Sequence, residues 1–363
     1  MKSTFSGIRA WQDGSAVHIF WGAANPTSKA SFIMDAVWDG QKAVMQKAIE
    51  FPPKEPAPMS LPNGIAVNKE DGEDYLYVVL NGNNELVKLR LKDRRQIWTV
   101  PTSMAPYGIT IAASKAYVTN WAGSVPPNAA QHTAGIPYGK VLVDPRTGAT
   151  ASGTVSVINL QTGKTEKEVA VGLHPNAIIS SPDQNYVYVA NGNSDHVSVL
   201  NTETNTVVHS IPVQLNKDAD YVGDSPNALA LDQRGATLYV SNGLDNAIAV
   251  VKLGKNAGGS GATSVLGFIP TEAYPAGLVI GGQTLYVCNL EGEGARAQSK
   301  NGGYNCHNQE ATLSMIPLPG AKNLQAYTER VKASNLVFRT ELSQRLPRKE
   351  VAAKPVPERI GEP

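Results

Sequence analysis

Polar residues gather where the strands of a repeating pattern begin and end, and their side chains could bind a small molecule. Asn offers a hydrogen-bond donor and an acceptor, and His and Trp add an imidazole and an indole N–H. The candidate ligand-binding residues are Asn120, Trp121, His174, Asn176, Asn191, Asn227, Asn242 and Asn289. His174 and Trp121 break the repeat and are the stronger candidates. The repeated asparagines have a second, structural interpretation, because Asn tolerates a left-handed backbone and closes turns.

Sequence motifs of metal, haem or nucleophile chemistry are absent from the chain. It has no His-Glu-x-x-His, no Gly-x-Ser-x-Gly and no Cys-x-x-Cys-His. Gly163-Lys164-Thr165 resembles the end of a phosphate-binding loop, but Ile158 stands where the first Gly is needed. We therefore expect no catalytic residue, no metal site and no cofactor in this chain.

Charge and hydropathy exclude two further classes of partner. The net charge is +1, which argues against nucleic acid, since nucleic-acid binders carry a basic field. No apolar run approaches the ~20 residues of a membrane-spanning helix. The expected partners are a small-molecule ligand and, as argued below, another protein domain.

An internal repeat dominates the chain and must position these side chains. A phrase of Pro, a small residue and an aliphatic residue recurs at Pro62, Pro106, Pro175, Pro226 and Pro275. Each copy is followed by a Tyr-Val strand and then by a strand of alternating apolar residues, as in Thr154–Ile158. Units of four short strands in about 45 residues are typical of β-propeller blades.

Six blade units can be counted in the sequence. The five Pro-containing units follow a degenerate first unit, with strands expected at 6–11, 16–21, 30–37 and 43–51. No fourth strand is evident after 312–317. The long connections 122–152, 214–224 and 290–310 all fall on the face shared by the second-to-third and fourth-to-first strand connections. Because binding residues concentrate on loops of a rigid scaffold, this face is the candidate binding face.

The repeats resemble the YVTN β-propeller family, whose tetrapeptide stands here at Tyr117–Asn120. Stretches around 143–157 and 267–275 resemble the N-terminal propeller half of bacterial proteins that carry a C-terminal phosphoesterase domain of the alkaline-phosphatase superfamily. The resemblance implies an all-β, seven-bladed propeller with about six blades present. It also implies a phosphoesterase-like partner domain beyond Pro363 and a periplasmic or secreted location. No signal peptide is visible.

Composition divides the chain into three parts. Residues 1–320 form the expected propeller, which lacks N-terminal sequence. Residues 321–346 form a short C-terminal helical extension, predicted by an apolar stripe of Leu324, Tyr327, Val331, Phe338 and Leu342. Residues 347–363 contain four prolines and are predicted to be a linker toward a missing domain.

The two cysteines flank one insertion. Cys288 and Cys306 could close it as a disulfide, which would fit an extracytoplasmic protein. In the alternative, Cys288 is a buried thiol and Cys306 is free.

Two classes of function remain open. In the first, the chain is a non-catalytic scaffold or ligand-binding module of a larger extracytoplasmic, phosphoesterase-like protein. In the alternative, it is a propeller hydrolase of lactonase or phosphoesterase type in its own right, since lactonases resemble YVTN propellers. The missing set of acid, base and metal ligands favours the first class.

Overall fold

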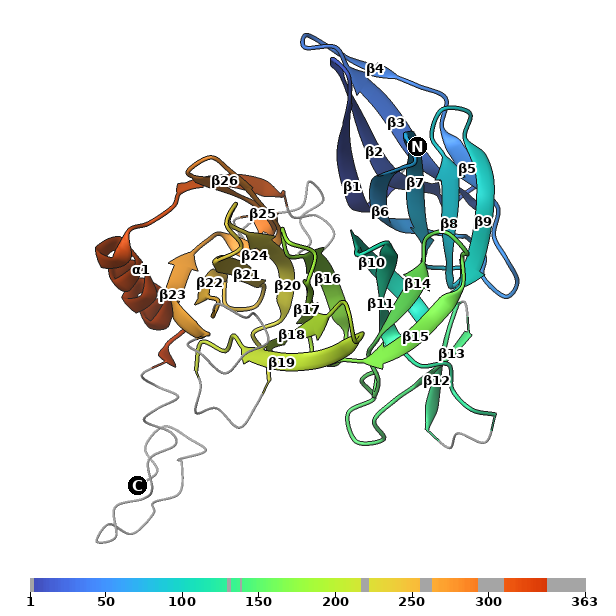
Figure 1. Cartoon of the computed structure of the whole chain (residues 1–363). Coiled ribbons are helices and arrows are strands. Elements are labelled where there is room, and N and C mark those ends of the chain that lie inside the picture. Colours follow the sequence, from blue (N-terminus) through green and yellow to red (C-terminus); the bar gives the residue numbers. More distant parts are fainter. Residues whose placement is uncertain are drawn as a thin grey trace, which may run out of the picture.

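The structure is a computed structural model that describes residues 3–128, 132–137, 139–216, 222–254, 263–292 and 310–337, with the backbone alone for residues 3–6. Within these ranges the chain forms six antiparallel sheets, one short hairpin and one α-helix. The sheets follow one another along an arc, each side by side with the next (Figure 1). The expectation of an all-β propeller with six blade units and a C-terminal helix is confirmed.

Blades 1 to 3 come from the N-terminal half of the chain. Blade 1 consists of β1 (Ser3–Asp13), β2 (Ala16–Asn25), β3 (Ala30–Trp38), β4 (Ala43–Met45) and β5 (Ile49–Phe51). Blade 2 consists of β6 (Pro62–Glu70), β7 (Glu73–Leu80), β8 (Glu85–Arg90) and β9 (Arg95–Pro101). Blade 3 consists of β10 (Met104–Ala112), β11 (Lys115–Gly123), β14 (Thr154–Asn159) and β15 (Thr165–Ala170). The hairpin of β12 (Thr133–Ile136) and β13 (Gly139–Leu142) is inserted between β11 and β14.

Blades 4 to 6 complete the arc. Blade 4 consists of β16 (Pro175–Ser180), β17 (Tyr186–Asn191), β18 (His196–Asn201) and β19 (Thr206–Pro212). Blade 5 consists of β20 (Pro226–Leu231), β21 (Thr237–Asn242), β22 (Ala247–Lys252) and β23 (Ser264–Pro270). Blade 6 has three strands among the described residues, β24 (Ala273–Gly281), β25 (Thr284–Gly292) and β26 (Thr312–Pro317). The expected absence of a fourth strand directly after β26 agrees with this sheet.

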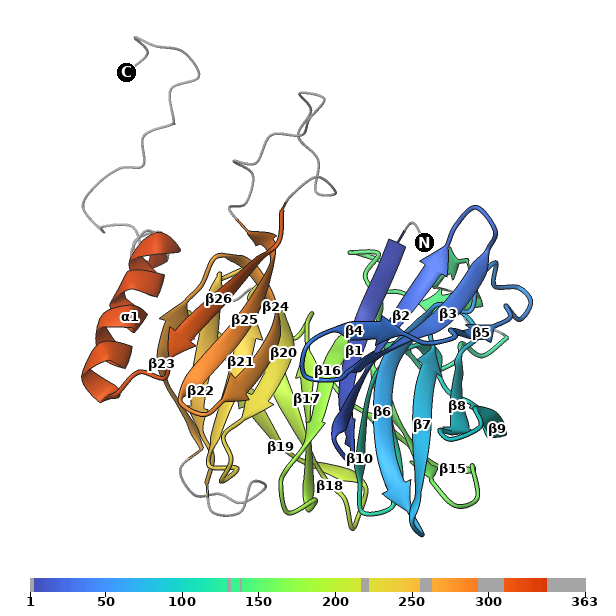
Figure 2. The same cartoon turned by 90° about the horizontal axis from the view of Figure 1, so that it is seen from above.

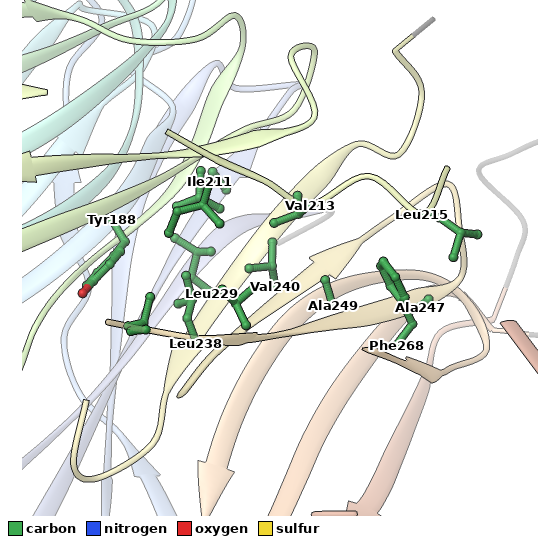
Figure 3. Close-up of a cluster of buried hydrophobic side chains, with 14 of the residues drawn as sticks. Tyr188, Ile211, Val213, Leu215, Leu229, Leu238, Val240, Ala247, Ala249 and Phe268 are labelled. Carbon is green, nitrogen blue, oxygen red and sulfur yellow. The ribbon is translucent and has the colours of Figure 1, made fainter. Parts of the chain in front are cut away.

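The core lies between neighbouring blades. Alternating Val, Leu and Ile residues send side chains to both faces of the middle strands, and each face packs against the next sheet. Figure 3 shows this packing between blades 4 and 5, where Tyr188 and Ile211 meet Leu229, Leu238 and Val240. A blade in the middle of the arc is thus stabilised from both sides.

The first strand of each Pro-containing blade begins with the same backbone conformation. The residue before the Pro has a left-handed φ near +50° to +57° at Leu61, Ala105, His174, Ser225 and Tyr274. The strand register shifts directly after the Pro in all five blades. This bulge turns the residue that follows the Pro out of the regular hydrogen-bond ladder, at the edge of each blade that lies on the candidate binding face.

Blade 1 differs from the expected pattern at its outer edge. Instead of one strand over 43–51, the structure has β4 and β5, which both pair with β3 at different positions. The interruption falls at Lys47, whose carbonyl accepts a hydrogen bond from Arg94 of blade 2. A contact with the neighbouring blade therefore replaces a strand pairing here.

The helix α1 (Ala321–Ser334) follows blade 6 and packs along β23 of blade 5. It ends where Leu336 adopts a φ of +53° and Asn335 donates to the carbonyl of Asp245 at 2.9 Å. The rest of the expected helical extension, with Phe338 and Leu342, and the linker 347–363 lie outside the described residues. The described part of the chain contains no helix with the length and apolar character needed to cross a membrane.

Candidate functional site

Three aromatic rings lie against one another at the candidate binding face, at the junction of blades 3 and 4. Tyr107 lies parallel to Trp121 with ring centroids 4.6 Å apart, and Trp121 lies 4.5 Å from the ring of His174. We call these three residues the aromatic stack. The structure thus brings together the two candidates that break the repeat, and it adds Tyr107. Sequence reasoning missed Tyr107, although it stands where Asn176 and Asn227 stand in other blades.

The inserted hairpin holds Trp121 in place. Trp121 packs against a small apolar cluster that includes Met104 and Ala122 of blade 3 and Val141 and Ala134 of the hairpin. Its indole Nε1 is buried and has no hydrogen-bond partner among the described residues. An unpaired buried N–H costs free energy, so this group is ready to donate to a ligand.

His174 occupies the left-handed position before Pro175, with φ at +53°. Burial lowers the pKa of its imidazole below the usual value. The ring is therefore neutral at neutral pH and can accept a proton. Within the described residues neither ring nitrogen has a hydrogen-bond partner.

Two of the candidate asparagines meet across the next junction. Asn176 Nδ2 donates to Asn227 Oδ1 at 3.0 Å, which joins blades 4 and 5. Asn176 Oδ1 is buried without a partner among the described residues and is a free acceptor. The amide of Asn176 and the ring of His174 both lie against Gly192, where an added Cβ would be 2.8 Å from Asn176 Nδ2 and 3.3 Å from His174 Nδ1. These two side chains therefore share one small space.

The other four asparagines are fully buried. In three of them the amide donates to a serine of the third strand of the same blade, over 2.8–3.0 Å. The three pairs are Asn120–Ser156, Asn191–Ser198 and Asn289–Ser314. Blade 5 has Ala249 at the serine position, and Asn242 donates instead to Asp245 Oδ2 at 2.9 Å and to the carbonyl of Val213, after blade 4, at 2.8 Å. The structure does not bring these four side chains to the aromatic stack.

A cluster of three aspartates lies between blades 4 and 5 and was not singled out in the sequence. Asp195 accepts hydrogen bonds from the backbone of Gly223, Asp224 and Ser225, at 2.6–3.1 Å. Burial and the hydrogen bond to Asp224 raise the pKa of Asp245 to about 9. Burial also raises the pKa of Asp195. The cluster therefore retains a proton at neutral pH. Its hydrogen bonds link the turn that contains Asp195 to residues 223–225.

A polar cavity of about 330 Å³ opens elsewhere, between blades 1 and 2. Its lining includes Asp35, which binds His18 Nδ1 at 3.1 Å and Arg94 Nη2 at 3.0 Å. One carboxylate oxygen thus binds His18 within blade 1, and the other joins blade 1 to Arg94 of blade 2. Across the described residues, no group of three or more His, Cys, Asp or Glu side chains is arranged to hold a metal ion.

Cys288 lies on β25 with an exposed thiol. The alternative of a buried Cys288 is therefore wrong, because no sheet among the described residues covers that face of blade 6. Cys306 lies outside the described residues, so the disulfide stays a prediction.

Comparisons with known proteins support the propeller fold and favour one of the two classes of function. Residues 149–265 match the model of the family described as "Lactonase, 7-bladed beta-propeller". A candidate 6-phosphogluconolactonase from Bacteroides uniformis has a similar structure, with a TM-score of 0.55, 13% identity and 86% of each chain covered. Another, from Bacteroides fragilis, has a TM-score of 0.50 and 12% identity, covering 86% of this chain and 84% of its own. No curated protein sequence matches this chain.

A further similar structure is a protein of unknown function from Desulfotomaculum acetoxidans, with a TM-score of 0.50 and 12% identity, covering 85% of this chain and 99% of its own. At these identities the structures show the propeller fold alone. The family match covers β14 and β15 of blade 3, all of blade 4 and the first three strands of blade 5. It contains His174, Asn176 and Asn227. The comparisons favour the hydrolase alternative over the scaffold reading. They do not bear on the phosphoesterase-like partner domain or on the location of the protein, which stay predictions.

Proposed function

We propose that this chain is a lactonase-type hydrolase that opens a small cyclic ester beside the aromatic stack. The observation that carries the proposal is the neutral, unbonded imidazole of His174 next to two unpaired polar groups, Trp121 Nε1 and Asn176 Oδ1. The similarity of residues 149–265 to the lactonase family supports it, because that segment contains His174 and Asn176.

The proposed reaction is general-base hydrolysis. His174 removes a proton from a water molecule, whose oxygen attacks the ring carbonyl of the ester. The C–O bond of the ring then breaks, and the proton moves from His174 to the ring oxygen that leaves. The product is the open hydroxy acid. Trp121 Nε1 would donate to the carbonyl oxygen as its charge grows, and Asn176 Oδ1 would accept a substrate hydroxyl.

The charge of these residues favours one kind of substrate. Tyr107, Trp121, His174, Asn176 and Asn227 carry no positive charge at neutral pH. A phosphate group would need Arg or Lys partners. We therefore propose an uncharged, hydroxyl-rich lactone in preference to a phosphorylated one.

The test is turnover of glucono-1,5-lactone by the purified chain, corrected for spontaneous opening and compared with the 6-phosphorylated lactone. His174→Asn should lower kcat/KM by about 100-fold or more, as expected for loss of a general base. Asn keeps the left-handed backbone, so folding should be unaffected. Tyr274→Asn is the matched control, because Tyr274 has the same backbone position in blade 6, with φ at +57°.

The second candidate function is ligand binding without catalysis. It is favoured by one observation, the absence of a carboxylate bonded to His174 among the described residues. Saturable binding of a lactone by calorimetry with no turnover, and equal rates for the parent and His174→Asn, would support this reading and refute the hydrolase.

A further inference from the structure

The polar cavity between blades 1 and 2 contains a histidine that is held by a buried carboxylate. His18 Nδ1 donates to Asp35 Oδ1 at 3.1 Å, and Arg94 Nη2 donates to Asp35 Oδ2 at 3.0 Å. A carboxylate accepts hydrogen bonds and does not donate them, so the ring proton of His18 lies on Nδ1. The other ring nitrogen, Nε2, has no hydrogen-bond partner among the described residues. In the neutral ring it is a free acceptor.

The strand pattern of blade 1 places these side chains on the face that packs against blade 2. His18 and Phe20 alternate along β2, and Asp35 of β3 pairs with Phe20, so the three side chains share one face. The rings of His18 and Phe20 are stacked, with centroids 5.6 Å apart. Figures 1 and 2 show the two blades side by side. The apolar core between them includes Phe20 and Ile33, and it gives way to the cavity at His18.

The cavity lies on the face of the molecule opposite the aromatic stack. Its lining includes Asp13 at the turn from β1 to β2, Gly72 in the turn from β6 to β7, and Leu91 and Lys92 in the turn from β8 to β9. These turns join first to second strands and third to fourth strands, whereas the aromatic stack lies at the other ends of the strands. A volume of about 330 Å³ falls within the range of small-molecule pockets.

The basic side chains that line the cavity are already bound to acceptors of the protein. Besides Asp35, Arg94 donates to the carbonyl of Lys47. Lys92 donates to Glu73. An anionic ligand would have to displace these partners, so the cavity is poorly suited to an anion.

Several acceptors of the cavity have no such partner. Asp74 pairs with Lys69 Nζ at 3.0 Å. The exposed carboxylate of Asp13, in contrast, has no partner among the described residues. Gln46 Nε2 donates to the carbonyl of Val44 at 3.1 Å, which leaves Gln46 Oε1 unpaired. With the free imidazole nitrogen, blade 1 thus offers the cavity three kinds of acceptor, one of them charged.

We propose that this cavity binds a small organic ammonium ion, whose N–H groups donate to His18 Nε2 and to the Asp13 carboxylate. Hydrogen bonds between charged groups are stronger than neutral ones, and an ammonium group supplies up to three donors. The described residues contain no group of His, Cys, Asp or Glu side chains arranged for a metal ion, so an organic cation fits the cavity better than a metal.

The test is binding of 1,4-diaminobutane to the purified chain, measured by calorimetry. 1,4-Butanediol and succinate are the uncharged and anionic controls with the same number of carbons. We expect the diamine to bind at least about 10-fold more tightly than either control, because only the diamine forms charge-assisted hydrogen bonds with these acceptors.

A matched pair of variants tests the part of Asp13. Asp13→Asn should weaken binding of the diamine by about 3-fold, since an ion pair at an exposed carboxylate contributes modestly. Glu203→Gln is the control. It removes an exposed carboxylate from the turn between β18 and β19 of blade 4, and it should leave the affinity unchanged.

The ring of His18 provides a direct readout of the site. In ¹⁵N NMR spectra, the Nε2 signal of His18 should move when the diamine is added and should stay in place with butanediol. His18→Gln removes this signal and so identifies it. The signals of His196 are the internal control, because His196 Nδ1 bonds the carbonyl of Ser194 at 2.8 Å in blade 4, and they should not move.

Three outcomes would overturn the proposal. The first is binding of succinate as tight as that of the diamine, which would mean that Lys92 and Arg94 set the preference. The second is a diamine titration that does not saturate below about 10 mM, since the affinity would then be too weak for a built site. The third is saturable binding that leaves the His18 signal in place and is unchanged by Asp13→Asn, which would put the diamine elsewhere on the protein.

Discussion

The first three strands of blade 5 and the three described strands of blade 6 follow the same pattern, but the two blades differ in what covers them. The third strand of blade 5 has Ile248 and Val250, which are 0% and 5% exposed. The third strand of blade 6 has Leu313 and Met315 at the same places, in solvent. Blade 5 lies between two sheets and also carries α1 on its outer strand. Alternating residues therefore specify a strand, but only the neighbouring sheets decide whether its faces become core.

The largest expected effect is a difference in stability between equivalent variants of blade 5 and blade 6. Ile248→Ala removes a buried side chain between blades 5 and 6, so the free energy of unfolding should fall by about 2–5 kcal/mol. Leu313→Ala at the equivalent site of blade 6 should change it by about 0.5 kcal/mol or less. Urea unfolding of both variants checks the difference. Equal losses would mean that Leu313 is buried in solution.

The sequence predicted the fold well because each blade repeats the same local pattern. The Tyr-Val strands, the Pro phrases and the missing fourth strand of blade 6 are all visible in single segments. Features that depend on contacts between blades were missed. The break between β4 and β5 depends on Arg94 binding the carbonyl of Lys47 in another sheet. Likewise, Asp195 and Asp245 stand in turns, where an aspartate is usually exposed, and nothing local indicates that Asp195 is buried and Asp245 half-buried.

The candidate site was predicted in part for the same reason. His174 and Trp121 stand out because they break the repeat, and they do lie together. Tyr107 was passed over because it fills a repeat position that is Asn in other blades. The four buried asparagines look identical in sequence to binding residues. In three of them a paired serine of the third strand makes the difference, whereas Asn242 has Ala249 there and bonds Asp245.

The next prediction concerns α1, which packs on blade 5, whereas no described helix packs on blade 6. Gly267→Val would place a side chain against Thr328 and Leu324, where an added Cβ already lies 2.4 Å and 3.0 Å from their atoms. Overpacking of this kind should lower the free energy of unfolding by about 1–3 kcal/mol. Gly135→Ala is the control, since nothing lies within 4 Å of its added Cβ. Thermal unfolding followed by circular dichroism checks both, and equal Tm values would contradict the tight docking of α1.

Protonation of Asp245 in blade 5 should also make the stability of the protein depend on pH. The pKa of Asp245 is raised from 3.8 to about 9 in the folded protein, so the folded state holds a proton that the unfolded state releases above pH 4. The stability that this proton contributes is present at low pH and is lost as pH rises from about 4 to about 9. Asp245→Asn keeps a neutral side chain and should flatten this decline. Urea unfolding at pH 5, 7 and 9 measures it, and parallel profiles for parent and variant would contradict the raised pKa.

The smallest difference in stability is expected between variants of two buried asparagines. One asparagine lies in a covered blade and the other in a blade with an exposed face. Asn191 in blade 4 and Asn289 in blade 6 are both fully buried, and each donates to a serine of its own third strand, at 3.0 Å and 2.8 Å. Because both bonds lie within one blade, Asn191→Ala and Asn289→Ala should each cost about 1 kcal/mol, with nearly equal values. Urea unfolding measures both. A much smaller cost for Asn289 would mean that the exposure of Leu313 and Met315 is accompanied by looser strands in blade 6, whereas equal costs would show that blade 6 is as well formed as blade 4.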